Sequence, residues 1–184
     1  MTRVLQIFRD GHERESSLNL ELLPGEQGNL QTLEAMKEIV LADRIEPDLR
    51  RFVLREVIGK VPGHDAMGEV NAIFEFARDR ITYRQDPVGV ERVADAWSTL
   101  YGLADEPEGD CGIKSTFLAT GLAMFGYRPY FVVIKQRANS KAYNHVYVAV
   151  EVEGEFVYLD PTPEDKPAGW QAPHFEIGLF PIFD

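Results

Sequence analysis

The chain of 184 residues contains one cysteine, Cys111, whose surroundings are typical of a thiol nucleophile. Cys111 stands where an acidic loop meets the start of a long apolar segment that predicts a helix. The free N–H groups and the dipole at a helix start stabilise an anion there. A thiol nucleophile also needs a base, and the base needs a third group that holds its imidazole in one tautomer. His145, at the start of a predicted strand, and Asp160, at the end of the next, are the candidates for these two roles.

The two strands that carry His145 and Asp160 predict how the side chains meet. Valines alternate along 146–152, Glu153-Gly154 predicts a turn, and 156–160 returns as a second strand. If the loop is even-numbered and centred on Glu153-Gly154, Val152 pairs with Glu155 and Tyr147 faces Asp160. His145 and Asp160 then share one face of the sheet as diagonal neighbours. An odd-numbered loop would place Asp160 opposite Val148 and on the wrong face.

Two opposing effects decide the pKa expected for the Cys111 thiol. The helix start and a protonated His145 would lower it, whereas the carboxylates in 105–110 would raise it. We expect those carboxylates to be solvated and screened, and Asp110 to be partly neutralised because it can cap the helix. The nearby effects should therefore dominate, and the sequence predicts a pKa below the ordinary value of about 8.5.

The remaining segments predict an α+β fold rather than a doubly wound sheet, because helices come first and antiparallel strands follow. The predicted elements are a hairpin over 4–22 with its turn at Asp10-Gly11, helices near 33–41, 47–57, 65–77 and 90–100, a long apolar helix from 111 to 125, and strands over 130–134, 146–152 and 156–160. The last three strands and the apolar helix carry the candidate nucleophile, base and orienting carboxylate.

Composition excludes several classes of function. The formal net charge of −11 disfavours nucleic acid and anionic membranes as partners. A single cysteine allows no internal disulfide, no segment approaches the roughly 20 apolar residues of a membrane span, and the first residues do not form a secretory signal. We expect a single domain over 1–184 in the cytoplasm, with a protein or peptide substrate. The histidines and the cysteine lack metal-ligand spacing, so no metal and no cofactor are expected.

Three motifs in order resemble the transglutaminase-like superfamily of papain-like folds, in its bacterial and phage form. They are Gly-Asp-Cys at 109–111, His-Val-Tyr-Val at 145–148, and Gly-Glu-Phe-Val-Tyr-Leu-Asp-Pro-Thr at 154–162. The resemblance covers about 30–165, which leaves 1–25 as an accessory hairpin and 166–184 as a tail. It departs at Gly112, where an acidic residue is frequent, and at Phe156, where tryptophan is usual.

The resemblance implies a Cys-His-Asp triad of Cys111, His145 and Asp160 on a Cys-bearing helix packed against an antiparallel sheet. It also implies acyl transfer or hydrolysis at a carboxamide or peptide bond through a thioester, with a protease or amidase favoured over a transglutaminase. The backbone N–H of Cys111 is one oxyanion donor by position. By resemblance Tyr83 is the second donor, with Gln85 and Trp97 as alternatives.

Two alternatives remain open at this stage. A transglutaminase-like fold can also serve as a non-catalytic module for binding or assembly, with the cysteine merely retained. The apolar segment 175–183 predicts core packing, and it could instead dock a partner or a second copy.

Overall fold

The computed structural model describes residues 3–9, 16–102 and 106–184. The predicted turn at Asp10-Gly11 lies outside these residues. The helical elements are α1 (Glu26–Asp43), α2 (Pro47–Phe52), α3 (Ala66–Arg80), α4 (Cys111–Met124) and two π-helical turns, η1 (Val53–Val57) and η2 (Ser98–Gly102). The strands are β1 (Arg3–Arg9), β2 (Ser16–Leu22), β3 (Thr82–Tyr83), β4 (Val90–Ala94), β5 (Glu108–Gly109), β6 (Pro129–Lys135), β7 (His145–Val152), β8 (Glu155–Leu159) and β9 (Glu176–Pro181).

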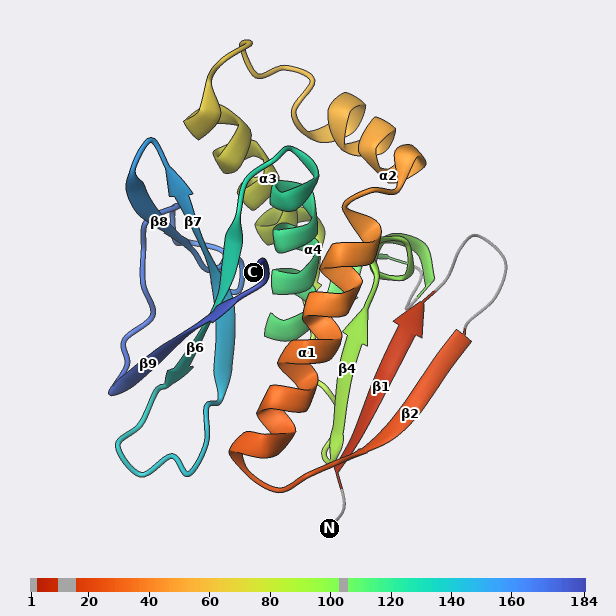
Figure 1. The fold of residues 1–184 in the computed structure, drawn as a ribbon, viewed down its shortest axis with the longest axis vertical. Coiled ribbons are helices and arrows are strands. Elements are labelled where there is room, and N and C mark those ends of the chain that lie inside the picture. Colours follow the sequence, from red (N-terminus) through yellow and green to blue (C-terminus); the bar gives the residue numbers. More distant parts are fainter. Residues whose placement is uncertain (1–2, 10–15, 103–105) are drawn as a thin grey trace.

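Two larger sheets enclose α4 and α1, and Figure 1 shows these helices between them. The C-terminal sheet has the order β8-β7-β6-β9 and is antiparallel throughout. The N-terminal sheet has the order β2-β1-β4, with β1 antiparallel to β2 and parallel to β4. A short parallel pair, β3-β5, leads into α4. The mixed arrangement of helices with separate sheets is compatible with the predicted α+β fold.

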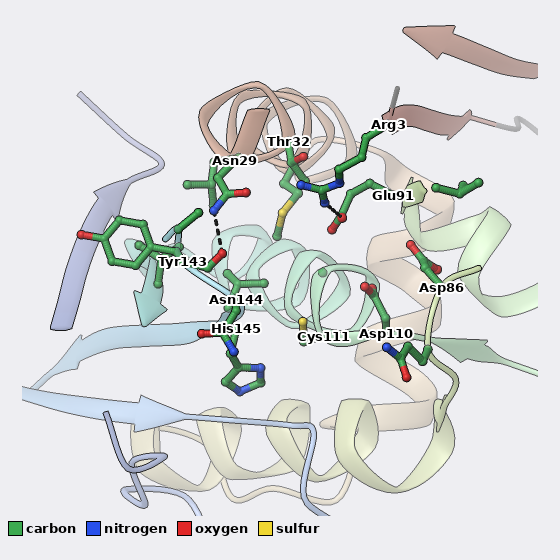
Figure 2. A pocket seen from close by; sticks show the side chains of 18 of the residues that line it. Arg3, Asn29, Thr32, Asp86, Glu91, Asp110, Cys111, Tyr143, Asn144 and His145 are labelled. Atoms are coloured by element: carbon green, nitrogen blue, oxygen red, sulfur yellow. Dashed lines mark hydrogen bonds and ion pairs between the residues drawn. The ribbon is translucent and has the colours of Figure 1, made fainter. Parts of the chain in front are cut away.

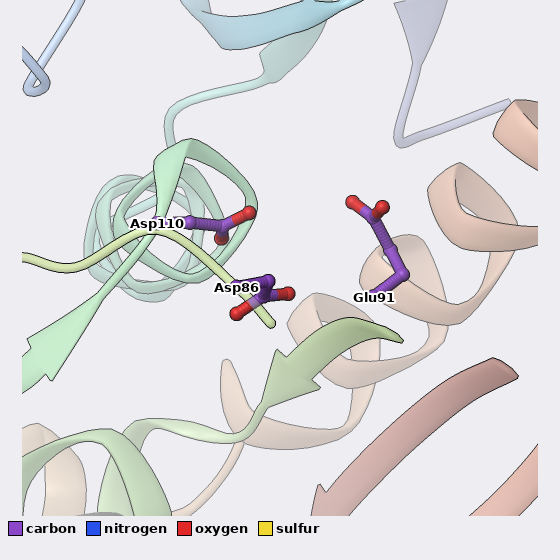
Figure 3. A group of neighbouring side chains, drawn as sticks. All are labelled: Asp86, Glu91 and Asp110. Carbon is purple, nitrogen blue, oxygen red and sulfur yellow. The ribbon is translucent and has the colours of Figure 1, made fainter. Parts of the chain in front are cut away.

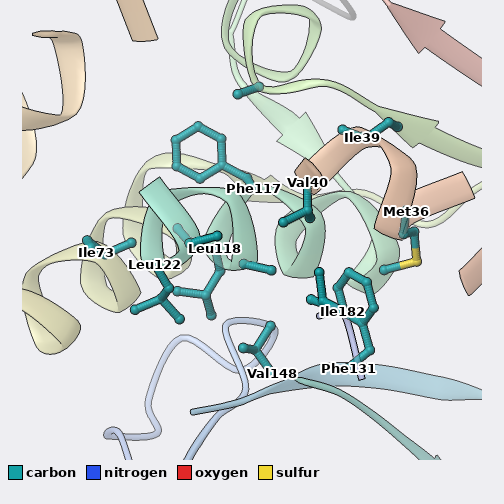
Figure 4. Packing of buried hydrophobic residues seen from close by; sticks show 14 of the residues in the cluster. Met36, Ile39, Val40, Ile73, Phe117, Leu118, Leu122, Phe131, Val148 and Ile182 are labelled. Carbon is teal, nitrogen blue, oxygen red and sulfur yellow. The ribbon is translucent and has the colours of Figure 1, made fainter. Parts of the chain in front are cut away.

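Helix α4 is the centre of the core. Every residue after Cys111 in this helix is buried, because its sequence is apolar on all sides and small residues such as Gly121 allow close packing. Phe117, Leu118 and Leu122 pack against residues of α1, α3 and the C-terminal sheet (Figure 4). Gly126, with φ +90°, ends the helix in the left-handed conformation that glycine adopts most easily.

The predicted helix over 90–100 is wrong. Val90–Ala94 forms β4, which pairs in parallel with β1 in the register Val4↔Val90 to Phe8↔Ala94, and helical structure begins only at Ala96, just before η2. Apolar residues at 90, 93, 94 and 97 fit helical spacing. However, β-branched valines fit a strand as well, and the hydrogen bonds offered by β1 decide between them.

The far face of the C-terminal sheet is also covered, which the alternation of valines does not predict. Tyr147 and Ala149 point away from α4 and are fully buried in a second, smaller cluster with Ala172 and Trp170. The segment that follows Asp160 therefore closes the back of the sheet. Part of the apolar tail forms β9, which pairs with β6. Leu179 within this strand is half exposed, whereas Ile182, which follows it, is buried.

Among the residues that the structure describes, no helix has both the length and the apolar character that crossing a membrane requires.

Candidate active site

Asp110 and Gly109 fix the start of α4 and so place Cys111 at its first position. The Asp110 side chain accepts a hydrogen bond from the Ile113 N–H at 3.1 Å, as an N-cap aspartate does. Gly109 lies so close to Ile113 that an added Cβ would stand 2.4 Å from its Cγ2 atom. Because the cap uses the Ile113 N–H, the Cys111 N–H remains directed toward the open end of the helix.

His145 and Asp160 meet in the way that the even-numbered turn predicts. Glu153 and Gly154 both have positive φ, 54° and 87°, as in a two-residue type I′ hairpin turn. Strand β7 then pairs with β8 from Val152↔Glu155 to Val148↔Leu159, which confirms the predicted register.

This register places the imidazole and the carboxylate in direct contact. His145 Nε2 lies 2.8 Å from Asp160 Oδ2, and the two side chains are only 9% and 2% exposed. The other carboxylate oxygen, Oδ1, accepts the Thr162 N–H at 3.0 Å. Both Asp160 oxygens therefore have hydrogen-bond partners. Nδ1 is the nitrogen of the His145 ring that remains available for another group.

Cys111 and His145 line one cavity of about 430 Å³. Figure 2 shows the Cys111 sulfur between the His145 ring and the Asp110 carboxyl in that view. The Val146 N–H, next in the chain to His145, hydrogen-bonds to the sulfur. The start of α4 and the start of β7 thus come together beside the cavity, and Ser115 Oγ also donates to the Val146 carbonyl at 3.1 Å.

The predicted lowering of the Cys111 pKa is wrong in sign. Burial raises the pKa of the thiol above its ordinary value, and the Asp110 carboxylate raises it further, while the Val146 N–H opposes both. The sequence predicts that capping partly neutralises the Asp110 charge, whereas in the structure this side chain is buried and its charge adds to the effect of burial on the thiol. The raised pKa leaves the Cys111 thiol neutral near pH 7.

Three carboxylates gather on the other side of Cys111. One oxygen each from Asp86, Glu91 and Asp110 lie within 4.8 Å of one another (Figure 3). Asp86 pairs with Arg92 at 2.7 Å, and Glu91 pairs with Arg3 at 2.5 Å.

Asp110 differs from the other two because it caps a helix instead of pairing with an arginine. Burial and the nearby Asp86 carboxylate together raise its pKa to about 7, against the opposing effect of the Ile113 and Gly112 N–H groups. Burial also raises the pKa of Glu91. Asp110 therefore carries a proton below about pH 7.

The candidate oxyanion donors do not all reach the cavity. Tyr83 and Gln85 line it with Cys111, and partial burial together with the nearby Asp110 and Asp86 carboxylates raises the pKa of the Tyr83 phenol. Trp97 is not among the described residues that line the cavity. Its ring packs against Phe52 at 5.9 Å and against Tyr101 at 5.8 Å.

Sequence reasoning misses Asp86 and Glu91 as neighbours of the nucleophile. Glu91 is missed because a helix over 90–100 would not place it in the cavity that Cys111 lines, and Asp86 is missed because it precedes Pro87 at the end of a short extended segment that suggests no role. The signal in the sequence is Gly89, a typical turn residue immediately before a valine-rich stretch. In the structure Gly89 adopts φ +85° and precedes strand β4.

Comparison with known proteins does not identify a family. No family model matches the chain, and no curated protein matches it. One solved structure with a similar chain path is a protein of Parabacteroides distasonis described as a "putative protease", at 12% sequence identity and a TM-score of 0.47. The match covers 88% of this chain and 36% of that one, so this chain spans about a third of its length. A likeness of this size assigns neither a family nor an activity.

Proposed function

We propose that the protein is a cysteine-dependent enzyme that cleaves or transfers acyl groups at carboxamide or peptide bonds, in a transglutaminase-like fold. The observation that carries the proposal is the 2.8 Å contact between His145 and Asp160, made in the wall of the cavity that also holds Cys111 at a helix start. A buried imidazole–carboxylate pair beside a thiol is the arrangement that nucleophilic acyl transfer requires.

In this mechanism His145 acts as a general base on a neutral thiol. As the Cys111 sulfur attacks the carbonyl carbon, its proton moves to His145 Nδ1, and Asp160 stabilises the imidazolium through Nε2. The Cys111 N–H and the Tyr83 hydroxyl donate to the oxyanion. His145 then protonates the leaving amine, the C–N bond breaks, and a thioester remains on Cys111.

The second half of the reaction decides the class of enzyme. Water or an amine attacks the thioester, His145 accepts its proton, and the product leaves as an acid or a new amide while the proton returns to the thiol. We favour hydrolysis, hence a protease or amidase. The chemistry up to the thioester is the same for a transglutaminase.

A second candidate is a non-catalytic binding or assembly module, and the raised pKa of the buried Cys111 thiol favours it. A Cys111 thiol that stays protonated would act as a small packing residue and not as a nucleophile.

An activity screen of the wild type against Cys111→Ala separates these proposals. Both proteins are incubated with a library of peptide carboxamides, with and without a primary amine, and products are read by mass spectrometry. The proposal expects, in the wild type only, a cleaved peptide or a carboxamide converted to a carboxylic acid with release of ammonia, and an amine adduct if transfer dominates. The non-catalytic module would be favoured if the wild type and Cys111→Ala gave the same mass spectra and if Cys111 did not react with peptide electrophiles.

A further inference from the structure

Lys114 is a buried cation one helical turn after Cys111. Its side chain is 1% exposed, and burial lowers its pKa to about 8. Lysine is rarely buried to this degree unless its ammonium is partnered. The apolar pattern of 111–125 does not predict a role for a lysine at this position, so the partners of its side chain are informative.

The Lys114 ammonium binds the C-terminal end of α3. Nζ donates to the Arg78 carbonyl at 3.0 Å and to the Ile81 carbonyl at 2.5 Å. Carbonyls at a helix end have no partner within the helix, and a cation there also interacts favourably with the helix dipole. Lys114 therefore ties the nucleophile helix to the point where α3 ends at Ile81.

The residues after Ile81 lead directly to the candidate oxyanion donor. The Thr82 N–H donates to the Pro107 carbonyl at 2.9 Å, and the Arg84 N–H donates to the Gly109 carbonyl at 3.0 Å. Strand β3 thereby pairs with β5, with Tyr83 opposite Gly109, two residues before Cys111.

The side chain of Tyr83 cannot be held by burial alone, because the residue is 44% exposed. Its place in the cavity wall depends on the backbone on either side of it. On one side, the hydrogen bonds of the β3-β5 pair hold this backbone against the loop before Cys111. On the other side, the Lys114 ammonium holds the end of α3, from which β3 continues.

We propose that Lys114 is a positioning residue, whose ammonium holds the start of β3 so that the Tyr83 hydroxyl stays beside Cys111 as an oxyanion donor. This inference depends on the proposed function for its catalytic consequence. The positioning itself can be measured without any activity.

The first test follows the Tyr83 phenol in Lys114→Met, which keeps the length and apolar stem of the side chain and removes its donors. Ultraviolet pH titration of each protein minus its Tyr83→Phe counterpart isolates this tyrosine. We expect its pKa to fall toward the ordinary 10 in Lys114→Met, because the phenol moves away from Cys111 and into solvent. Lys114→Arg, which keeps N–H donors, should restore part of the wild-type value.

The matched control is Lys37→Met, which makes the same change on α1, where the lysine pairs with Asp184. It should leave the Tyr83 titration unchanged. If Lys114→Met does not fold by near-ultraviolet circular dichroism, Lys114→Gln takes its place, because its amide still donates hydrogen bonds but is shorter and uncharged.

The second test is a double-mutant cycle on the rate of thioester formation. Lys114→Met and Tyr83→Phe should each lower kcat by about 10²-fold with little change in KM, and together should lower it hardly further. Losses that multiply, or a folded Lys114→Met with an unmoved Tyr83 titration, would overturn the inference. A wild type without activity would refute the proposed function instead, and the titration would still decide whether Lys114 positions Tyr83.

Discussion

Replacing Asp110 by asparagine should stabilise the protein at neutral and alkaline pH, although the residue caps the central helix. Asparagine keeps an oxygen for the Ile113 N–H and is as good an N-cap as aspartate. The substitution removes only the carboxyl whose pKa burial raises from 3.8 to about 7. A shift of that size corresponds to about 4 kcal/mol of unfavourable interaction in the charged state.

The sign follows from where the proton is bound. Between about pH 4 and pH 7 the folded protein holds a proton on Asp110 that the unfolded chain has lost. The contribution of Asp110 to stability therefore falls as pH rises through this window, and the full cost is present above pH 7. The free energy of unfolding of Asp110→Asn should match that of the wild type near pH 4 and exceed it by up to about 4 kcal/mol at pH 8.

Urea unfolding followed by circular dichroism, at half-unit steps from pH 4.5 to 8.5, measures this difference. Titrations of all other groups cancel because both proteins are studied in the same buffers. Asp65→Asn is the control, since Asp65 caps α3 in an exposed position through the Gly68 N–H at 2.8 Å. A variant that is less stable than the wild type at pH 8, or a difference that does not grow with pH, would refute the reasoning.

Three further predictions concern the thiol, the orienting carboxylate and the loop before the nucleophile. The rate of iodoacetamide labelling of Cys111 should rise with pH with a midpoint above the ordinary thiol pKa of 9.0, and Asp110→Asn should lower that midpoint. A wild-type midpoint below pH 7 would contradict the conclusion that burial raises the pKa of the thiol. Asp160→Asn should keep the fold but lower the acyl-transfer rate by up to about 10⁴-fold, and an unchanged rate would reduce Asp160 to a turn residue. Gly109→Ala should cost about 1–3 kcal/mol in urea unfolding, because the new Cβ meets Ile113; an equally stable variant would mean that the loop moves freely.

The parts of the site that depend on local rules could be predicted from the sequence. The helix start at Cys111, its cap at Asp110 and the β7-β8 register each follow from a few neighbouring residues. The contact between His145 and Asp160 is a direct consequence of that register.

The parts that depend on tertiary partners could not be predicted. Val90–Ala94 becomes a strand only because β1 lies beside it, and this brings Glu91 to the nucleophile. Burial of Asp110 is likewise invisible in the sequence, because an acidic loop reads as solvated. Burial of the Cys111 thiol itself and the charge of the buried Asp110 together reverse the direction expected for the Cys111 pKa.

The hairpin turn at Glu153-Gly154 makes the site far more sensitive to changes in chain length than to changes in residue type. Asp160 lies six positions beyond Gly154, or about 20 Å along the strand, so most substitutions at the turn leave it in place. Inserting or deleting one residue there would rotate every later side chain of β8 to the other face of the sheet. A single codon gained or lost would thus abolish the imidazole–carboxylate pair while leaving both of its members in the sequence.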